Sequence, residues 1–144
     1  MPPEGGSVLS RDQVTNYLAV LVRLASVDGI DDEERSFVQR AAASLGLQPD
    51  LADIAGKFVA DPSITSESLI EGIRDPGLRL CLLRDAYRLA AADGNFSETE
   101  IGELAHIARA LGIHNGLAAQ VRTVALQEAR LHREFAALVR AARR

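Results

Sequence analysis

The sequence Arg23-Leu-Ala-Ser-Val-Asp28-Gly29-Ile-Asp-Asp-Glu-Glu34 decides the fold, because a second version of it occurs later in the chain. The second version is Arg88-Leu-Ala-Ala-Ala-Asp93-Gly94-Asn-Phe-Ser-Glu-Thr-Glu100, with one extra residue after the Asp-Gly pair. The pattern Arg-Leu-Ala-x-x-Asp-Gly is common to both. In each copy the last glutamate is followed, eleven residues later, by a Leu-Gly pair. The chain is therefore predicted to contain one structural unit twice.

Each copy has the start and stop signals of two helices joined by an acidic turn. The glycine after each repeated aspartate is placed to end the first helix, since glycine accepts the left-handed conformation that follows many helices. Asp31 with Glu34 forms a capping box, in which the two side chains bond free backbone amides at a helix start. Ser97 with Glu100 gives the same signal in the second copy. The repeated unit is thus predicted to be helix, acidic turn, helix.

Apolar residues at helical spacing fill the rest of the chain, and no stretch shows the alternation of a strand. Seven helices are expected, over residues 10–28, 31–45, 49–60, 65–73, 75–92, 97–111 and 115–141, with Asn115 capping the last one. The predicted fold class is all-α, with two duplicated three-helix units joined by a short helix. Residues 1–9 are expected to be a flexible tail and residues 10–144 a single helical domain.

Composition and charge narrow the class of protein. Of the 144 residues, 47% are hydrophobic and 4% aromatic, which suits a core of close-packed aliphatic helices. The net charge of −4 and the lack of a basic stripe argue against a nucleic-acid partner. The single cysteine, Cys81, excludes an intramolecular disulfide, and no apolar run approaches the length of a membrane-spanning helix. We therefore predict a cytoplasmic protein without membrane insertion.

The two acidic turns are the candidate site. Hard cations such as Ca²⁺ and Mg²⁺ bind several converging oxygens, which carboxylates in a turn between helices can supply. The candidate ligands of a divalent cation are Asp28, Asp31, Asp32, Glu34, Asp93, Asn95, Glu98 and Glu100. The alternative is structural, because the same side chains can cap helices and interact favourably with the helix dipole. A standard EF-hand is excluded, since Leu89 and Ala91 would occupy positions that must coordinate the ion.

The histidines, the cysteine and the two repeated arginines are expected to have structural roles. The three histidines lie far apart in sequence, and His106 is expected to be a solvated helix residue. Cys81 has no neighbouring histidine or CxxC partner, which favours a buried apolar role. Arg23 and Arg88, each five residues before the repeated aspartate, are expected to form ion pairs or to bond loop carbonyls. With no phosphate loop, GxSxG or HExxH motif in the sequence, no enzymatic activity is expected.

The last helix carries an apolar stripe whose use the sequence leaves open. Its members are Leu117, Val121, Val124, Leu131, Phe135 and Leu138, interrupted by Glu128. Packing against the core is one interpretation. A homodimer seam or a surface for a partner protein is the other, because a helix of about 27 residues spans about 40 Å and can extend beyond a compact domain.

The repeated motif resembles that of the TerB-like family, which is named after a tellurite-resistance protein. The resemblance rests on an Ala-x-x-Asp-Gly turn after one helix, a glutamate that opens the next, and a Leu-Gly pair at its end. It covers residues 10–141, and the shorter first turn departs from the pattern. The N-terminal domain of certain membrane-anchored DnaJ-like co-chaperones is similar.

This resemblance implies an all-helical, non-enzymatic domain linked to resistance to tellurite and to other chemical or phage stress. It also suggests an acidic surface that binds a cation. The expected function is a cytoplasmic stress-response interaction module whose acidic turns bind a divalent cation and which recognises a protein partner. The alternative is a co-chaperone-like protein–protein adaptor in which metal has no role.

Overall fold

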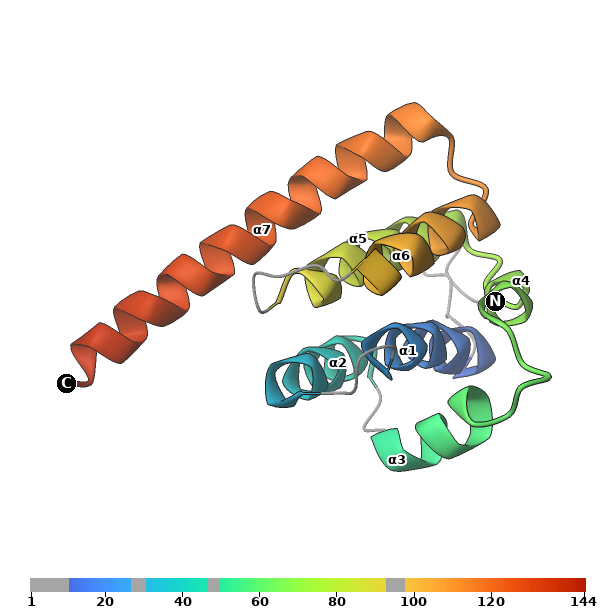
Figure 1. The fold of residues 1–144 in the computed structure, drawn as a ribbon, viewed down its shortest axis with the longest axis horizontal. Helices are drawn as coiled ribbons and strands as arrows, with labels where there is room; N and C mark the ends of the chain where they lie inside the picture. Colours follow the sequence, from blue (N-terminus) through green and yellow to red (C-terminus); the bar gives the residue numbers. More distant parts are fainter. Residues whose placement is uncertain (1–10, 27–30, 47–49, 93–97) are drawn as a thin grey trace, which may run out of the picture.

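The computed structural model describes residues 11–26, 31–46, 50–92 and 98–144, and all of its regular structure is helical (Figure 1). The elements are α1 (Arg11–Ala25), α2 (Asp32–Ser44), α3 (Leu51–Ile54), η2 (Ala55–Val59), α4 (Ser66–Glu71), α5 (Pro76–Ala90), α6 (Glu98–Ala110) and α7 (Asn115–Ala142). The predicted all-α class with seven α-helices is confirmed for these ranges, which contain no strand. The predicted tail, residues 1–9, lies outside them. No helix in the described part of the chain is both long and apolar enough to cross a membrane.

Helix α1 lies at the centre of the fold. It packs against α2, α3, η2, α4, α5 and α6 (Figure 1). Five consecutive residues, Leu18–Val22, are fully buried, which an amphipathic surface helix does not show. Helix α5 is the second core element, with Leu82, Leu83, Ala86 and Leu89 buried against α1 and its neighbours. The core therefore forms between α1 and α5, and the other helices cover this pair.

Local capping signals place the helix starts. Asp75 accepts a hydrogen bond from the Leu78 amide at 2.8 Å, and Pro76 follows at the first helical position of α5. Thr65 caps α4 in a box with Ser68. Gly46 and Gly112, the glycines of the two Leu-Gly pairs, follow the ends of α2 and α6 and have positive φ values of 83° and 69°. The glycines of the acidic turns, 29 and 94, lie outside the described residues.

One predicted cap is wrong. The N-cap of α7 is His114, whose Nδ1 accepts a hydrogen bond from the Leu117 amide at 3.1 Å, and Asn115 is the first helical residue. The imidazole here takes the position that serine, aspartate or asparagine usually holds. A neutral ring with its proton on Nε2 is required, because only an unprotonated Nδ1 can accept this bond.

The third helix changes its winding part-way. After the single turn of α3, residues Ala55–Val59 form a π-helical turn, and the Ala60 amide bonds the Ala55 carbonyl. The sequence predicted one continuous helix over this segment. Arg23 of α1 explains how the wider turn is held, since its Nη1 donates to the carbonyls of Phe58 at 3.0 Å and Ile64 at 3.1 Å.

The two predicted units pack in corresponding ways. Helix α1 packs on α2 and η2, α5 packs on α6 and α7, and the two central helices pack on each other. The duplication itself stays a prediction, because the turns that carry the repeated aspartates lie outside the described residues.

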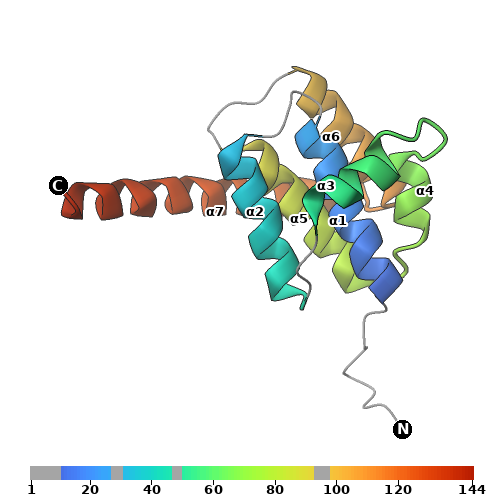
Figure 2. The same cartoon turned by 90° about the horizontal axis from the view of Figure 1, so that it is seen from below.

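Helix α7 extends beyond the body of the fold. Its first half lies along α5, and its C-terminal half projects away from the other helices (Figures 1 and 2). With 28 residues it is about 42 Å long, whereas the 15 residues of α5 span about 22 Å. The difference, about 20 Å, is the projecting part of α7.

Candidate functional site

At the start of α2 the predicted cation ligands are helix caps. Asp31 accepts a hydrogen bond from the Glu34 amide at 2.7 Å through Oδ1, and Glu34 Oε1 accepts one from the Asp31 amide at 3.2 Å. This is the capping box that the sequence predicts. The structural alternative is thus shown for these two carboxylates.

The other predicted ligands that the structure describes lie in the first turns of α2 and α6. Asp32 lies in the first turn of α2, and Glu98 and Glu100 lie in the first turn of α6. Asp28, Asp93 and Asn95 fall outside the described residues. Within the described ranges, no group of three or more His, Cys, Asp or Glu side chains is arranged to hold a metal ion. The described ligands therefore do not fit a cation site on their own.

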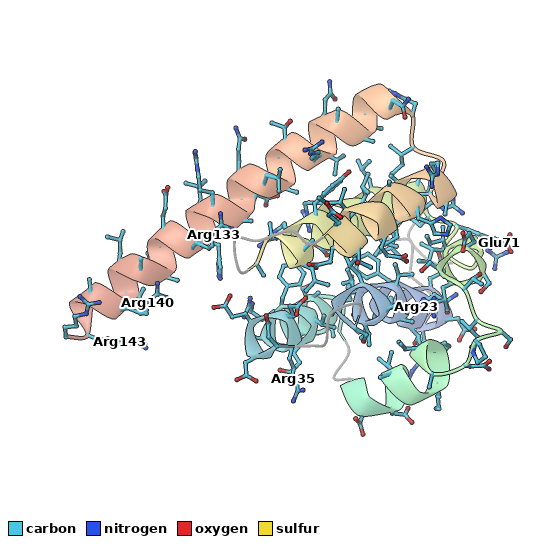
Figure 3. The ribbon with its side chains drawn as sticks, in the orientation of Figure 1. Arg23, Arg35, Glu71, Arg133, Arg140 and Arg143 are labelled. Carbon is cyan, nitrogen blue, oxygen red and sulfur yellow. The ribbon has the colours of Figure 1, made fainter. Side chains whose placement is uncertain are left out.

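The acidic start of α2 instead forms one wall of a cleft. The cleft has a volume of about 750 Å³ and lies between α2, the C-terminal end of α5 and the projecting half of α7. Asp31, Asp32 and Glu33 line it from α2. His132, Arg133 and Arg140 of α7 also line it. Figure 3 shows Arg133 and Arg140 on the projecting half of this helix. Sequence reasoning missed this cleft because its walls are about a hundred residues apart in the chain.

Arg88 of α5 also lines this cleft. Its guanidinium is centred 5.4 Å from the ring of Phe37, and its Nη1 is 4.0 Å from Oε2 of Glu128. A cation over an aromatic face is attracted by the ring quadrupole. Beside it, Nη1 of Arg133 donates to the Ala91 carbonyl at 2.6 Å, which ties α7 to the end of α5. The cleft arginines Arg88 and Arg133 therefore fix α7 against the body.

Arg23 of α1 is the residue that matches Arg88 in the first copy of the repeat. Its bonds to backbone carbonyls confirm the structural role predicted for it. In addition to the two carbonyls it bonds after α3, its Nε donates to the hydroxyl of Ser66 at 3.2 Å. The buried Ser66 hydroxyl in turn donates to Glu103 of α6 at 3.0 Å. One guanidinium thus joins α1 to the π-helical turn, to α4 and, through Ser66, to α6.

A buried polar pair lies between α1 and α5. The Tyr17 hydroxyl donates a hydrogen bond to Oδ2 of Asp85, and Arg84 donates to Oδ1 at 3.3 Å through Nη2. Burial raises the pKa of the Tyr17 hydroxyl well above its ordinary range, and the negative charge of Asp85 raises it further. This pair could not be predicted from the sequence, because its two members are 68 residues apart.

The three histidines do not converge. His106 of α6 is 43% exposed, in line with the predicted solvated helix residue, and it also contacts the carboxylate of Glu67 on α4. His114 caps α7, and His132 lines the cleft. Each imidazole therefore has its own local partner or surface.

The apolar stripe of α7 is largely exposed to solvent. The exposed fractions are 51% for Val124, 58% for Leu131, 65% for Phe135 and 67% for Leu138. The face of α7 that packs against α5 is made of small residues instead, with Ala125 and Ala129 buried. Core packing is therefore the wrong interpretation of the second half of the stripe.

A shallow apolar groove continues the stripe onto the body. It has a volume of about 260 Å³ and is lined by residues of α5 and α7. These are Gly77, Leu80, Cys81, Arg84, Gln120, Val121 and Val124. Cys81 is partly buried in this groove, close to the apolar role that the sequence predicts.

Comparisons with known proteins found no match. No protein-family model matches the chain, and no curated protein or solved structure matches it.

Proposed function

We propose that this chain is a non-enzymatic, TerB-like interaction module of the stress-resistance type, acting in the cytoplasm through the surface of its projecting helix α7. The observation that carries the proposal is the exposure of Leu131, Phe135 and Leu138 on one face of that helix. Scattered exposed hydrophobic residues are ordinary on protein surfaces, whereas a contiguous apolar face marks an interaction site.

The length of the projection supports this surface as a binding element. An isolated helix of about 13 residues is marginal in water, because helix nucleation is unfavourable and few hydrogen bonds repay it. Arg133 ties the projecting half of α7 to the body, but Leu131, Phe135 and Leu138 are each more than half exposed, so the packing of this apolar face contributes little to the stability of the helix. A partner that covers the apolar face would supply the missing packing.

The polar groups of the cleft support binding rather than catalysis. Asp31 caps α2, Arg88 stacks on Phe37, and Arg133 bonds a backbone carbonyl. Each of these groups is already used to hold a helix in place. This favours the adaptor form of the function, in which partner recognition needs no bound metal.

The experiment that tests the function is a survival assay in the native host. We expect deletion of the coding sequence to reduce growth under tellurite or another chemical stress, and wild-type protein to restore it. The double variant Leu131→Ser/Phe135→Ser should fail to restore growth although it is folded by circular dichroism. Ala137→Ser is the matched control, because two residues along an α-helix rotate a side chain by about 200°, away from the stripe. Unchanged growth of the deletion strain under every stress would contradict the proposed role.

A second readout separates the adaptor from a metal-dependent module. Partners captured on wild-type protein should remain bound in the presence of a chelator and with Asp93→Asn. Loss of the same partners in both conditions would instead restore the cation hypothesis for the acidic turns. Both arms use the full chain.

A further inference from the structure

We propose that the projecting helix α7 pairs antiparallel with α7 of a second copy of this chain, so that each copy covers the apolar stripe of the other. This inference rests on the proposed function, because it names the first partner of the same surface. It begins from the spacing of the exposed side chains. Val124, Leu131, Phe135 and Leu138 recur at intervals of seven, four and three residues, the spacing of the a and d positions of a coiled-coil seam.

The two halves of α7 have complementary shapes. The C-terminal half presents projecting side chains, Leu131, Phe135 and Leu138. The N-terminal half presents the apolar groove, whose lining includes Cys81 and Val121, and the stripe enters this groove at Val124. Only an antiparallel pair puts the projecting side chains of each copy on the groove of the other. Such a pair is isologous and closes as a twofold dimer.

The register follows from matching the two halves. With the twofold axis near residues 129 and 130, Phe135 of the second copy lies over Val124, and Leu138 lies over Val121 and Cys81. Leu131 then packs beside the aliphatic part of Glu128, the residue that interrupts the stripe. The shared seam from Val121 to Leu138 is about 25 Å long, which allows a continuous interface.

Charge favours the same direction of pairing. Residues 130–144 contain five arginines and one glutamate, a net charge of +4, so the other 129 residues carry −8 of the total of −4. In an antiparallel pair the basic ends of the two α7 helices lie at opposite ends of the seam, away from each other. A parallel pair would bring the two basic ends together and would place Glu128 opposite Glu128. The opposed helix dipoles also favour the antiparallel pair.

A second copy explains this surface better than an anionic membrane does. A basic helix with an apolar face can also lie on lipid headgroups. However, the groove on the body has no role in that case, and a body with a net charge of −8 is repelled by an anionic surface. Self-association uses both the stripe and the groove, whereas membrane binding uses the stripe alone.

Sedimentation equilibrium between about 1 and 200 μM tests the pairing. We expect the wild-type chain to form a dimer and Phe135→Asp to raise the dimer Kd by at least about tenfold, as for the loss of a central interface side chain. Ala137→Asp, on the opposite side of α7, should leave the Kd within about twofold of wild type. A monomer at every concentration, or equal effects of the two variants, would overturn the proposal.

Disulfide trapping tests the direction. Under mild oxidation, Leu138→Cys should form an intermolecular disulfide with the native Cys81, and the link should disappear in the double variant Cys81→Ser/Leu138→Cys. A link that persists in the double variant indicates a parallel pair and refutes the antiparallel one. Vesicles of anionic lipid form a further arm: binding by a chain that stays monomeric assigns the stripe to a membrane. If the chain is monomeric and Leu131→Ser/Phe135→Ser still abolishes stress resistance, the dimer fails and the proposed function stands.

Discussion

Tyr17 of α1 and Asp85 of α5 are joined by a buried hydrogen bond, in which the tyrosine hydroxyl donates to Oδ2 of the carboxylate. Both side chains lie in the contact between the two central helices, and both are almost fully buried. The other carboxylate oxygen accepts from Arg84, which is itself partly exposed. The pair therefore fixes how α1 and α5 face each other in an otherwise apolar contact.

We expect Tyr17→Phe to destabilise the fold by about 1–3 kcal/mol, because a buried carboxylate oxygen loses its donor. The effect should depend on pH. The raised pKa of Tyr17 means that the folded state keeps the hydroxyl proton after the unfolded state has lost it near pH 10. The stabilisation is therefore complete below pH 10 and is lost at about 1.4 kcal/mol per pH unit above it. Urea unfolding of both proteins at pH 8 and pH 11 measures this. If wild type and Tyr17→Phe differ in free energy of unfolding by the same amount at pH 8 and at pH 11, the result argues against the buried pair.

Arg79 offers a test of how the helix ends are held. Its guanidinium donates to the carbonyls of Ile73 at 2.6 Å, Leu111 at 3.1 Å and Ile70 at 3.3 Å, so one side chain joins the ends of α4 and α6. We expect Arg79→Ala to lower the free energy of unfolding by about 2–3 kcal/mol. Arg74→Ala removes the same charge from an exposed position and should change stability by less than about 0.5 kcal/mol. Thermal unfolding of the two variants compares them, and similar losses would contradict this role of Arg79.

Replacing glycine by alanine should have opposite effects on stability at Gly72 and at Gly102. A Cβ at Gly72 would lie 2.2 Å from Nδ2 of Asn16, which donates to the Leu69 carbonyl, so Gly72→Ala must break that bond. We expect a loss of about 1–2 kcal/mol. Gly102, within α6, has open space around it, and Gly102→Ala should stabilise by about 0.5–1 kcal/mol through helix propensity. Chemical denaturation of both variants gives the signs, and a shared sign would show that the Asn16 contact is unimportant.

Substitutions of Asp31 distinguish a helix-capping role from a cation-binding role. Asparagine is as good an N-cap as aspartate but lacks its charge, so Asp31→Asn should keep nearly all the stability while Asp31→Ala loses about 1 kcal/mol. Millimolar Ca²⁺ or Mg²⁺ should leave the melting temperature of both the wild type and Asp31→Asn unchanged. A metal-induced rise in the wild type that Asp31→Asn removes would establish a cation site that includes Asp31.

The helices could be predicted because their signals are local. Asp75 before Pro76, and the box of Asp31 with Glu34, specify helix starts within four residues of sequence. The cap of α7 was predicted one residue late, because an imidazole that accepts through Nδ1 is an unusual N-cap. The π-helical turn was missed because the contact that holds it comes from Arg23 on another helix.

The surfaces could not be predicted because they depend on which face of a helix the body covers. In the sequence, the large apolar residues of α7, such as Leu131 and Phe135, indicate the face that should be buried. In the structure these residues are exposed, and the face that packs against α5 carries alanines. Small side chains such as Ala125 and Ala129 let two helices approach closely, and their burial leaves the larger residues outside. The pattern alone therefore gave the stripe but not its exposure.

Hydrogen exchange of the α7 backbone, measured by mass spectrometry at low and high protein concentration, tests most directly whether the projecting half of this helix is an interface between copies. The amides of residues 131–142 should exchange quickly in dilute protein and slowly in concentrated protein, because pairing stabilises a segment that is marginal alone. Peptides from α1 provide the internal control and should exchange equally slowly at both concentrations. Exchange in residues 131–142 that does not depend on concentration would contradict the account.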